Sequence, residues 1–282
     1  MRKNMQEKKE WKIFYLGHSA FLIECPSCTM VFDYSEDYLV GDMPIWDHKK
    51  PLYVFVSHKH QDHYSRKIFE WAKEMESVTY LLSNDIRMST TYMQKIGISQ
   101  TAGRHIFFLG RRKKYRVQKE IVLQIEDDTE IQLKPPYEQK EELISDKPVF
   151  EFETFLSTDA GTAFLIEIDK KRIYHAGDLN WWTWKNQTKQ EKEQIFSRYK
   201  EEIERIGKRK IDLAFLPLDP RQENDFFLGM DYFIKNTDTK MAFPMHCWND
   251  YSVIQKLKEM EESSSYRDRI IEVSDKQREF YI

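Results

Sequence analysis

Residues 52–63 read Leu52-Tyr53-Val54-Phe55-Val56-Ser57-His58-Lys59-His60-Gln61-Asp62-His63. The run opens with five apolar residues, which is typical of a strand buried on both faces. Three of the chain's eight histidines follow within six positions, so a merely polar surface run is a weak alternative. Side chains two residues apart on an extended strand end point to the same side, so we expect His58 and His60 to bind one ion. Asp62 and His63 lie just beyond, within reach of a second ion.

Other stretches predict short strands and helices around this motif. The strand-like runs are residues 12–16, 20–25, 30–32, 52–56, 78–82, 121–125, 131–133, 149–155, 163–168, 172–175, 211–216 and 240–244, and the pattern returns to β from Ile106 onward. The helical patterns are residues 65–75, 84–96, 189–206 and 251–262, and a charged stretch from Pro135 to Lys147 predicts a surface loop. Two β-rich halves, each with helices, predict two facing sheets covered by helices. We expect one domain spanning residues 1–282.

Composition excludes several classes of protein. The chain has 282 residues, a net charge of −3 and 32% charged residues, which argues against nucleic acid as the default partner. We expect no membrane-spanning helix, because no window approaches the roughly 18 uncharged apolar residues that one needs. Residues 1–10 are polar and charged, so we expect no signal peptide there. Three cysteines are too few for a disulfide framework, so we expect a cytoplasmic protein. Cys25 and Cys28 have the spacing of a redox pair or half a zinc site, but their place between two strands favours a hairpin turn.

Two more apolar, strand-like runs end at residues of types that commonly bind metals, an aspartate and a histidine. They read Tyr174-His175-Ala176-Gly177-Asp178 and Phe243-Pro244-Met245-His246. Together with His58–His63, and in this order, they resemble the motifs of the metallo-β-lactamase superfamily over about residues 11–248. The opening residues Gly17-His18-Ser19 and the strand end at Asp33 are similar to the first hairpin of that family. The resemblance implies an α/β four-layer αββα sandwich, in which two mixed sheets lie face to face with helices outside, and hydrolysis by a metal-bound hydroxide.

The resemblance also implies two divalent metal ions, zinc first, with manganese or iron as alternatives. By this similarity the first ion is bound by His58, His60 and Asp178, and the second by Asp62, His63, Asp178 and His246. Asp62 would also orient the hydroxide, which makes it the expected catalytic residue. His175 precedes Asp178 by three residues, and a structural role suits it better.

The sequence departs from the family at one ligand of the first ion. The stretch Phe155-Leu156-Ser157-Thr158-Asp159-Ala160-Gly161 has no histidine where the family has one. Asp159 is the best substitute, because carboxylates bind zinc, manganese and iron. The alternative is that Asp159 only shapes a turn.

Three residues are candidates for contact with the substrate. Trp181 follows Asp178 closely, His18 belongs to the hairpin that borders the site in this family, and Arg221 follows an apolar strand. Arg221 either clamps an anion or pairs with a nearby carboxylate, Asp219 or Glu223.

Within the family, the short spacings between motifs and the ending Pro244-Met245-His246 resemble one branch most. That branch contains L-ascorbate-6-phosphate lactonases and N-acyl phosphatidylethanolamine phospholipase D. A small, anionic ester, lactone or phosphodiester is therefore the expected substrate. A metal-binding regulatory module without hydrolysis, and a nuclease of the same fold, remain alternatives, and a homo-oligomer is compatible with the sequence.

Overall fold

The computed structural model describes residues 11–127, 129–137 and 149–282. Within them, the strands of the first sheet are β1 (Lys12–Gly17), β2 (Ala20–Glu24), β3 (Thr29–Phe32), β4 (Leu52–Val56), β5 (Val78–Ser83), β6 (Ile106–Leu109) and β15 (Glu279–Tyr281). The strands of the second sheet are β7 (Lys114–Gln118), β8 (Ile121–Glu126), β9 (Thr129–Gln132), β10 (Phe150–Leu156), β11 (Thr162–Ile168), β12 (Lys171–His175), β13 (Lys210–Pro217) and β14 (Asp238–Met245). Their spatial orders are β15-β1-β2-β3-β4-β5-β6 and β14-β13-β12-β11-β10-β7-β8-β9.

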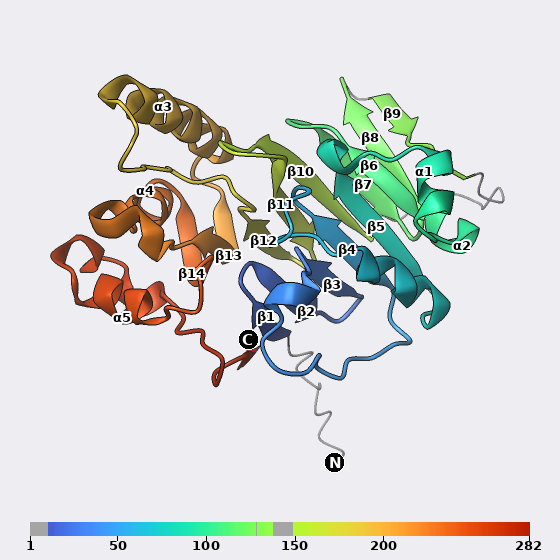
Figure 1. Ribbon diagram of the computed structural model, residues 1–282, viewed down its shortest axis with the longest axis horizontal. Coiled ribbons are helices and arrows are strands. Elements are labelled where there is room, and N and C mark those ends of the chain that lie inside the picture. Colours follow the sequence, from blue (N-terminus) through green and yellow to red (C-terminus); the bar gives the residue numbers. More distant parts are fainter. Residues whose placement is uncertain (1–10, 128, 138–148) are drawn as a thin grey trace, which may run out of the picture.

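The α-helices of the described residues are α1 (Thr90–Lys95), α2 (Gln100–Gly103), α3 (Lys189–Ile206), α4 (Leu228–Asn236) and α5 (Ser252–Glu259). Short 3₁₀ helices are η1 (Glu36–Tyr38), η2 (Arg66–Lys73), η3 (Asn84–Ile86), η4 (Pro220–Asp225), η5 (Glu261–Ser263) and η6 (Arg267–Arg269). Figure 1 shows α3, α4 and α5 near β13 and β14, with α1 and α2 at the other end of the molecule.

Alternation along the strands explains how both sheets are covered. In β4, Phe55 packs into the cluster between the sheets, whereas Val54 and Val56 belong to a second apolar cluster that includes Ile68 of η2 and Met93 of α1. All five residues of β4 are therefore buried, as its apolar run predicts.

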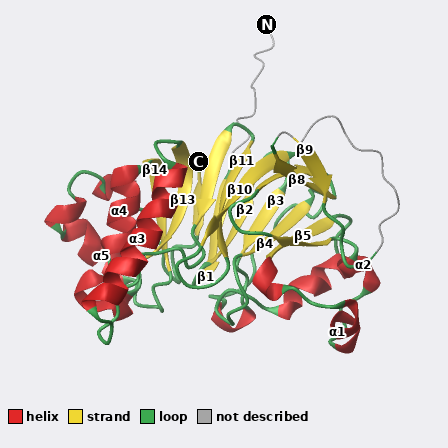
Figure 2. Cartoon of the chain, turned by 90° about the horizontal axis from the view of Figure 1, so that it is seen from above, coloured by secondary structure: helices red, strands yellow, loops and turns green. Residues whose placement is uncertain are grey.

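The second sheet shows the same alternation. In β12, the ring of His175 stacks on Phe32 of the first sheet, with centroids 5.0 Å apart. Tyr174, one residue earlier, stacks on Phe233 of α4 at 4.6 Å. One face of the strand thus lies against the first sheet and the other against a helix. The predicted sandwich of two mixed sheets with helices outside is confirmed, and Figure 2 shows the strands in the middle of the molecule.

The parallel part of each sheet positions the site. β3, β4, β5 and β6 are parallel in the first sheet, and β12, β13 and β14 are parallel in the second. Ligand-type residues follow five of these strands at their carboxyl ends, and they are Asp33 after β3, His58 after β4, Asp178 after β12, Asp219 after β13 and His246 after β14. The carboxyl ends of parallel strands are the usual place for a ligand site in an α/β sheet.

Most predicted elements are confirmed, and α3 has the expected bounds. It begins with a capping box formed by Thr188 and Glu191, and it ends at Gly207, whose φ is 63°. The predicted helix at residues 65–75 is the 3₁₀ helix η2 instead. The pattern at residues 84–96 divides into η3 and α1, because Ser89 caps a new helix by accepting a hydrogen bond from the Tyr92 amide.

The turn at Cys25 and Cys28 is also confirmed. β2 and β3 pair antiparallel through Glu24 and Thr29, and the Cys25 amide donates to the Cys28 carbonyl at 3.0 Å. Most of the predicted loop that ends at Lys147 lies outside the described residues. No helix in the described parts of the chain is long and apolar enough to cross a membrane.

Candidate metal centre

Four predicted ligands form a first cluster, made of His58, His60, Asp159 and Asp178. Their ligand atoms all lie within 4.8 Å of one another. His58 Nε2 is 3.4 Å from Asp178 Oδ2, and His60 Nδ1 is 3.7 Å from Asp159 Oδ2. The structure therefore brings Asp159 together with the three residues that were expected to bind the first ion. The short loop between β10 and β11 carries it there, and Gly161 at φ 69° turns this loop closely over Ser57.

A second cluster consists of His18, Asp62, His63 and His246, and its ligand atoms also lie within 4.8 Å of one another. Asp178 lies between the two clusters. Its Oδ1 is 3.1 Å from His63 Nε2 and 3.5 Å from His246 Nε2, whereas its Oδ2 faces His58. This is the arrangement that a bridging carboxylate needs. His18 was expected at the pocket wall, and the structure places it in the second cluster.

The donor atoms of both clusters show whether metal ions fit this site. Five buried atoms in it have no hydrogen-bond partner in the protein, namely the Nε2 atoms of His18, His58, His63 and His246 and Oδ1 of Asp178. Each unsatisfied buried polar group costs about 1–3 kcal/mol, so five in one place need a common explanation. Imidazole nitrogens and carboxylate oxygens are the donors that divalent transition metals prefer. The residues present fit two such ions.

A buried carboxylate, Asp33, orients two of these histidines. His63 Nδ1 donates to Asp33 Oδ2 at 2.7 Å, which leaves the lone pair of His63 Nε2 directed at the cluster. The Ser57 hydroxyl donates to the same oxygen at 2.6 Å and accepts from His58 Nδ1 at 2.9 Å. Asp33 thus selects the tautomer of His63 directly and that of His58 through Ser57. Such supports behind metal ligands raise ligand basicity.

Asp219 supports His246 in the same way. His246 Nδ1 donates to Asp219 Oδ2 at 2.9 Å, and the indole of Trp248 donates to that oxygen at 3.2 Å. Arg221 Nε lies 3.0 Å from both Asp219 oxygens, and its guanidinium packs 4.1 Å from the Trp248 ring centroid. Burial raises the pKa of Asp219, but the hydrogen bonds from His246 and Arg221 outweigh it and lower that pKa to about 2. Asp219 therefore remains charged.

The pKa values of the clusters agree with ligand chemistry. Burial lowers the pKa of His18 and of His58 to about 4, so both rings are neutral at pH 7 and can use their lone pairs. Burial would raise the pKa of Asp62, but the His18 imidazole, whose Nε2 lies 3.2 Å from Oδ2 of Asp62, and the charge of His63 lower it. Burial and the charge of Asp178 raise the pKa of Asp159, as expected of two carboxylates held close together without a cation.

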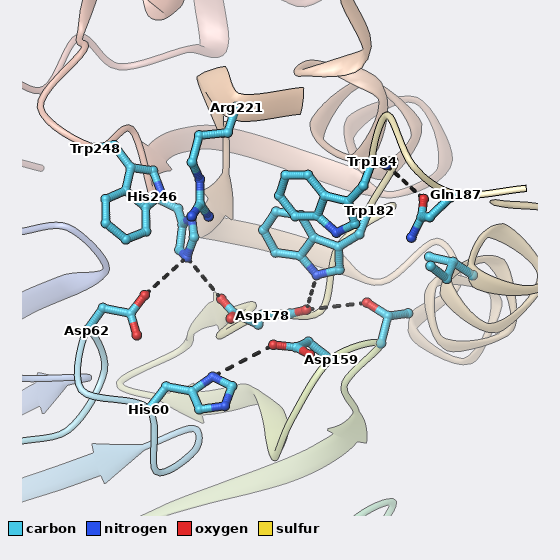
Figure 3. Close-up of a pocket in the computed structure, with 12 residues that line it drawn as sticks. His60, Asp62, Asp159, Asp178, Trp182, Trp184, Gln187, Arg221, His246 and Trp248 are labelled. Carbon is cyan, nitrogen blue, oxygen red and sulfur yellow. Dashed lines mark hydrogen bonds and ion pairs between the residues drawn. The ribbon is translucent and has the colours of Figure 1, made fainter. Parts of the chain in front are cut away.

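Both clusters lie at the floor of a pocket of about 390 Å³. Its lining residues are His60, Asp62, Thr158, Asp159, Asp178, Trp182, Trp184, Gln187, Ile195, Arg221, His246 and Trp248. Figure 3 shows the indole rings and Arg221 over the floor that His60, Asp62, Asp159 and Asp178 form. Arg221 thus lies at the pocket, as expected, and it also pairs with Asp219, which was the alternative.

The assignment of Trp181 to the pocket is wrong. Its ring stacks on Phe196 of α3 at 4.0 Å, while Trp182 and Trp184 line the pocket. The indole of Trp182 donates to the Asp178 carbonyl at 2.9 Å, and this bond holds the Trp182 ring beside the two clusters. The sequence showed that an indole borders the site, but not which one, because the chain there is neither helix nor strand.

His175 has a structural place. Its Nε2 donates to the Ser19 carbonyl at 2.9 Å, and its Nδ1 accepts from the Gly177 amide at 3.2 Å. Sequence reasoning missed the supporting roles of Asp33, Ser57 and Asp219. The local signal for them is that each lies within two residues of the carboxyl end of a strand, β3, β4 or β13.

The sandwich of two mixed sheets and the two clusters at one of its edges define a candidate metal centre. The beta-lactamase superfamily domain matches residues 12–195, and the chain belongs to this superfamily. Igni18, a metallo hydrolase from the hyperthermophilic archaeon Ignicoccus hospitalis, is 14% identical, with a TM-score of 0.59 over 97% of this chain and 98% of that chain. The metallo-beta-lactamase fold protein YhfI from Bacillus subtilis is 10% identical, with a TM-score of 0.54 over 98% of this chain and 100% of that chain. At these identities the similarity shows the fold, and the expected superfamily is confirmed.

Proposed function

We propose that this protein is a hydrolase that uses two divalent metal ions, zinc first, to cleave a small anionic ester, lactone or phosphodiester. The observation that carries the proposal is the convergence of unpartnered histidine nitrogens on Asp178 at the floor of an open pocket. A site that only stores metal needs no pocket of about 390 Å³ above it. When bound, such ions would supply a water that ionises near neutral pH and positive charge facing a carbonyl or phosphoryl oxygen.

Asp62 would orient the attacking water. It lines the pocket, and its lowered pKa keeps it ionised at neutral pH. A carboxylate with so low a pKa is a weak base, so it orients the water by accepting a hydrogen bond more than it removes a proton. Asp178 would keep both clusters at a constant separation, because its two oxygens face different histidines.

The walls of the pocket favour a substrate with one anionic end and one apolar or ring-shaped part. Arg221 uses Nε and Nη2 for Asp219, and no hydrogen bond to the described residues is made by Nη1, which leaves a donor for an anion. Trp182 and Trp184 stack with centroids 5.5 Å apart and offer flat apolar surface. The ending Pro244-Met245-His246 resembles that of lactonases and phospholipases of the superfamily, which supports lactone or phosphodiester chemistry.

The test is hydrolysis of three chromogenic probes, namely p-nitrophenyl acetate, a thio-lactone and bis(p-nitrophenyl) phosphate, together with metal analysis of the same preparation. We expect up to two ions per chain and loss of hydrolysis in a chelator, with recovery on addition of zinc or manganese. Asp178→Asn should lower occupancy of both clusters, because Asp178 lies between them. Asp268→Asn is the matched control, since Asp268 is exposed and outside both clusters. Equal metal content and hydrolysis in wild type and Asp178→Asn would reject the proposal.

A further inference from the structure

His18 occupies a turn that the surrounding backbone holds closely. Gly17 pairs with Ala20 across the ends of β1 and β2, so His18 and Ser19 form a two-residue connection. Gly17 has a φ of 130°, and a Cβ there would lie 2.1 Å from the Tyr38 carbonyl oxygen. His18 itself has a φ of 47°, in the left-handed region that residues other than glycine seldom adopt. Strained backbone of this kind is concentrated at functional sites.

The side chain of His18 is directed at the second cluster. It is 4% exposed, and its Nε2 is buried without a hydrogen-bond partner. That nitrogen lies 3.2 Å from Asp62 Oδ2, and the ring centroid lies 4.2 Å from that of His246. Tyr38 and Trp248 pack around the ring at 5.1 and 4.8 Å, which restrains its rotation.

The backbone couples His18 to a predicted ligand. The His246 amide donates to the His18 carbonyl at 3.0 Å. His246 also has a positive φ, 63°, so two strained histidines from different sheets are bonded to each other. This contact holds the β1–β2 turn against the end of β14 and keeps both imidazoles in one place.

Two other roles for His18 explain the geometry less well. A residue that contacts the substrate should line the pocket, and His18 is not among the lining residues. A purely structural buried histidine should have partners on its nitrogens, as His175 has through Ser19 and Gly177. His18 Nε2 instead faces the space that the other ligand atoms of the second cluster surround.

We propose that His18 is a metal ligand of the second cluster, in addition to Asp62, His63, Asp178 and His246. This inference rests on the metal dependence of the proposed function, but on no particular substrate. It makes the second cluster rich in nitrogen and almost closed, because the side chains of His18, His63 and His246 are 0–3% exposed. The first cluster is open by comparison, because the side chains of His60 and Asp159 are 48% and 52% exposed. The second cluster therefore binds zinc more tightly than the first.

The experiment measures zinc affinity by competition with a chromophoric chelator, which resolves a tight and a weak dissociation constant. His18→Asn is the main variant, because asparagine tolerates the positive φ at this position. We expect the tight constant to weaken by at least about tenfold, since even the loss of a group that supports a ligand costs 10–100-fold. His60→Ala should weaken only the weak constant. His48→Ala is the control for unspecific loss of a histidine, because His48 is exposed and outside both clusters.

A loss of zinc binding is distinguished from a folding defect by comparing each variant with its own metal-free form. The rise in Tm on addition of zinc should shrink in His18→Asn even if the metal-free protein is less stable than wild type. An unchanged tight constant in His18→Asn, together with its loss in His246→Ala, would overturn the role of His18 and leave the hydrolase proposal intact. A wild-type protein that binds no zinc or manganese would overturn both. A zinc-loaded structure decides independently, with His18 Nε2 about 2.0–2.1 Å from the ion if it is a ligand and well beyond bonding distance if it is not.

Discussion

Asp33 and Asp219 each lie behind a histidine of the site and never reach the pocket. Both are buried, and both remain charged because donors surround them. Burying a carboxylate is costly unless it is paired and hydrogen-bonded. The protein retains two such groups where they orient His63 and His246, so the geometry of the metal centre depends on residues that contact neither metal nor substrate.

Asp33→Asn tests this dependence. An amide of the same shape presents an NH₂ group where Asp33 now accepts from His63 and Ser57, so one of these hydrogen bonds is lost. We expect zinc affinity to fall about 10–100-fold. The chelator competition assay measures this, with Asp268→Asn as the control for loss of a carboxylate. Wild-type affinity in Asp33→Asn would show that His63 does not need the orienting charge.

Arg221→Gln separates substrate recognition from support of Asp219. Removing the guanidinium should raise KM for the phosphodiester probe about tenfold, because a hydrogen bond to a charged group contributes about 1.5–3 kcal/mol. KM for the neutral acetate should change little, and zinc affinity should be retained because His246 still donates to Asp219. Arg221→Lys is the matched variant, because it keeps the positive charge but loses the bidentate contact of the guanidinium with Asp219. An equal rise in KM for both probes would argue against recognition of an anion.

The histidines and aspartates that form the two clusters could be singled out from the sequence, because an apolar strand that ends at a histidine or aspartate is a local pattern. The roles of Asp33, Asp219 and His18 could not. They depend on contacts between residues far apart in the chain, such as the 3.0 Å hydrogen bond between His246 and His18. Trp181 was misplaced for a different reason, since no helix or strand periodicity sets the side-chain direction in this irregular segment.

The loops between strands bring the ligands to the carboxyl edge of both sheets. Strand positions could be predicted from alternation and apolar runs, and β4 and α3 agree well with them. The type of helix at η2 and η3 could not be predicted, because an amphipathic pattern does not distinguish an α-helix from a short 3₁₀ helix. The β10–β11 loop is a further case, since its course depends on one glycine packed against the other sheet.

Gly161→Ala tests that loop. A Cβ at Gly161 would lie 1.9 Å from the Ser57 carbonyl oxygen and 2.5 Å from His58 Cβ, at a φ of 69°. The loop must move away, and Asp159 must move with it. We expect a loss of stability greater than about 1 kcal/mol and weaker binding at the first cluster. Gly97→Ala is the matched control, because Gly97 has a φ of 80° but no atom within 4 Å of a new Cβ. Urea unfolding and zinc competition of both variants provide the measurement, and equal effects would mean that backbone strain alone matters.

Across the whole molecule, the two clusters lie at an edge where the two sheets meet, so each sheet contributes candidate ligands. His58, His60, Asp62 and His63 follow a strand of the first sheet, and Asp159, Asp178 and His246 follow strands of the second. Three carboxylates belong to the clusters, those of Asp62, Asp159 and Asp178, and burial together with the charge of Asp178 raises the pKa of Asp159. Bound ions would remove this repulsion and link the sheets at one edge.

Removal of metal should therefore destabilise the entire fold and not only the pocket. An ion that binds the folded chain at a free concentration 1,000 times its Kd adds about 4 kcal/mol to the free energy of unfolding. For a chain of this size, about 1 kcal/mol corresponds to roughly 2–4 °C in Tm. A chelator should thus lower Tm by on the order of 10 °C, and zinc should restore it. Differential scanning calorimetry with and without the chelator measures the shift, and Asp178→Asn should show a smaller shift than wild type because it binds metal less tightly. The same Tm in both conditions would mean that the clusters bind no ion that links the two sheets.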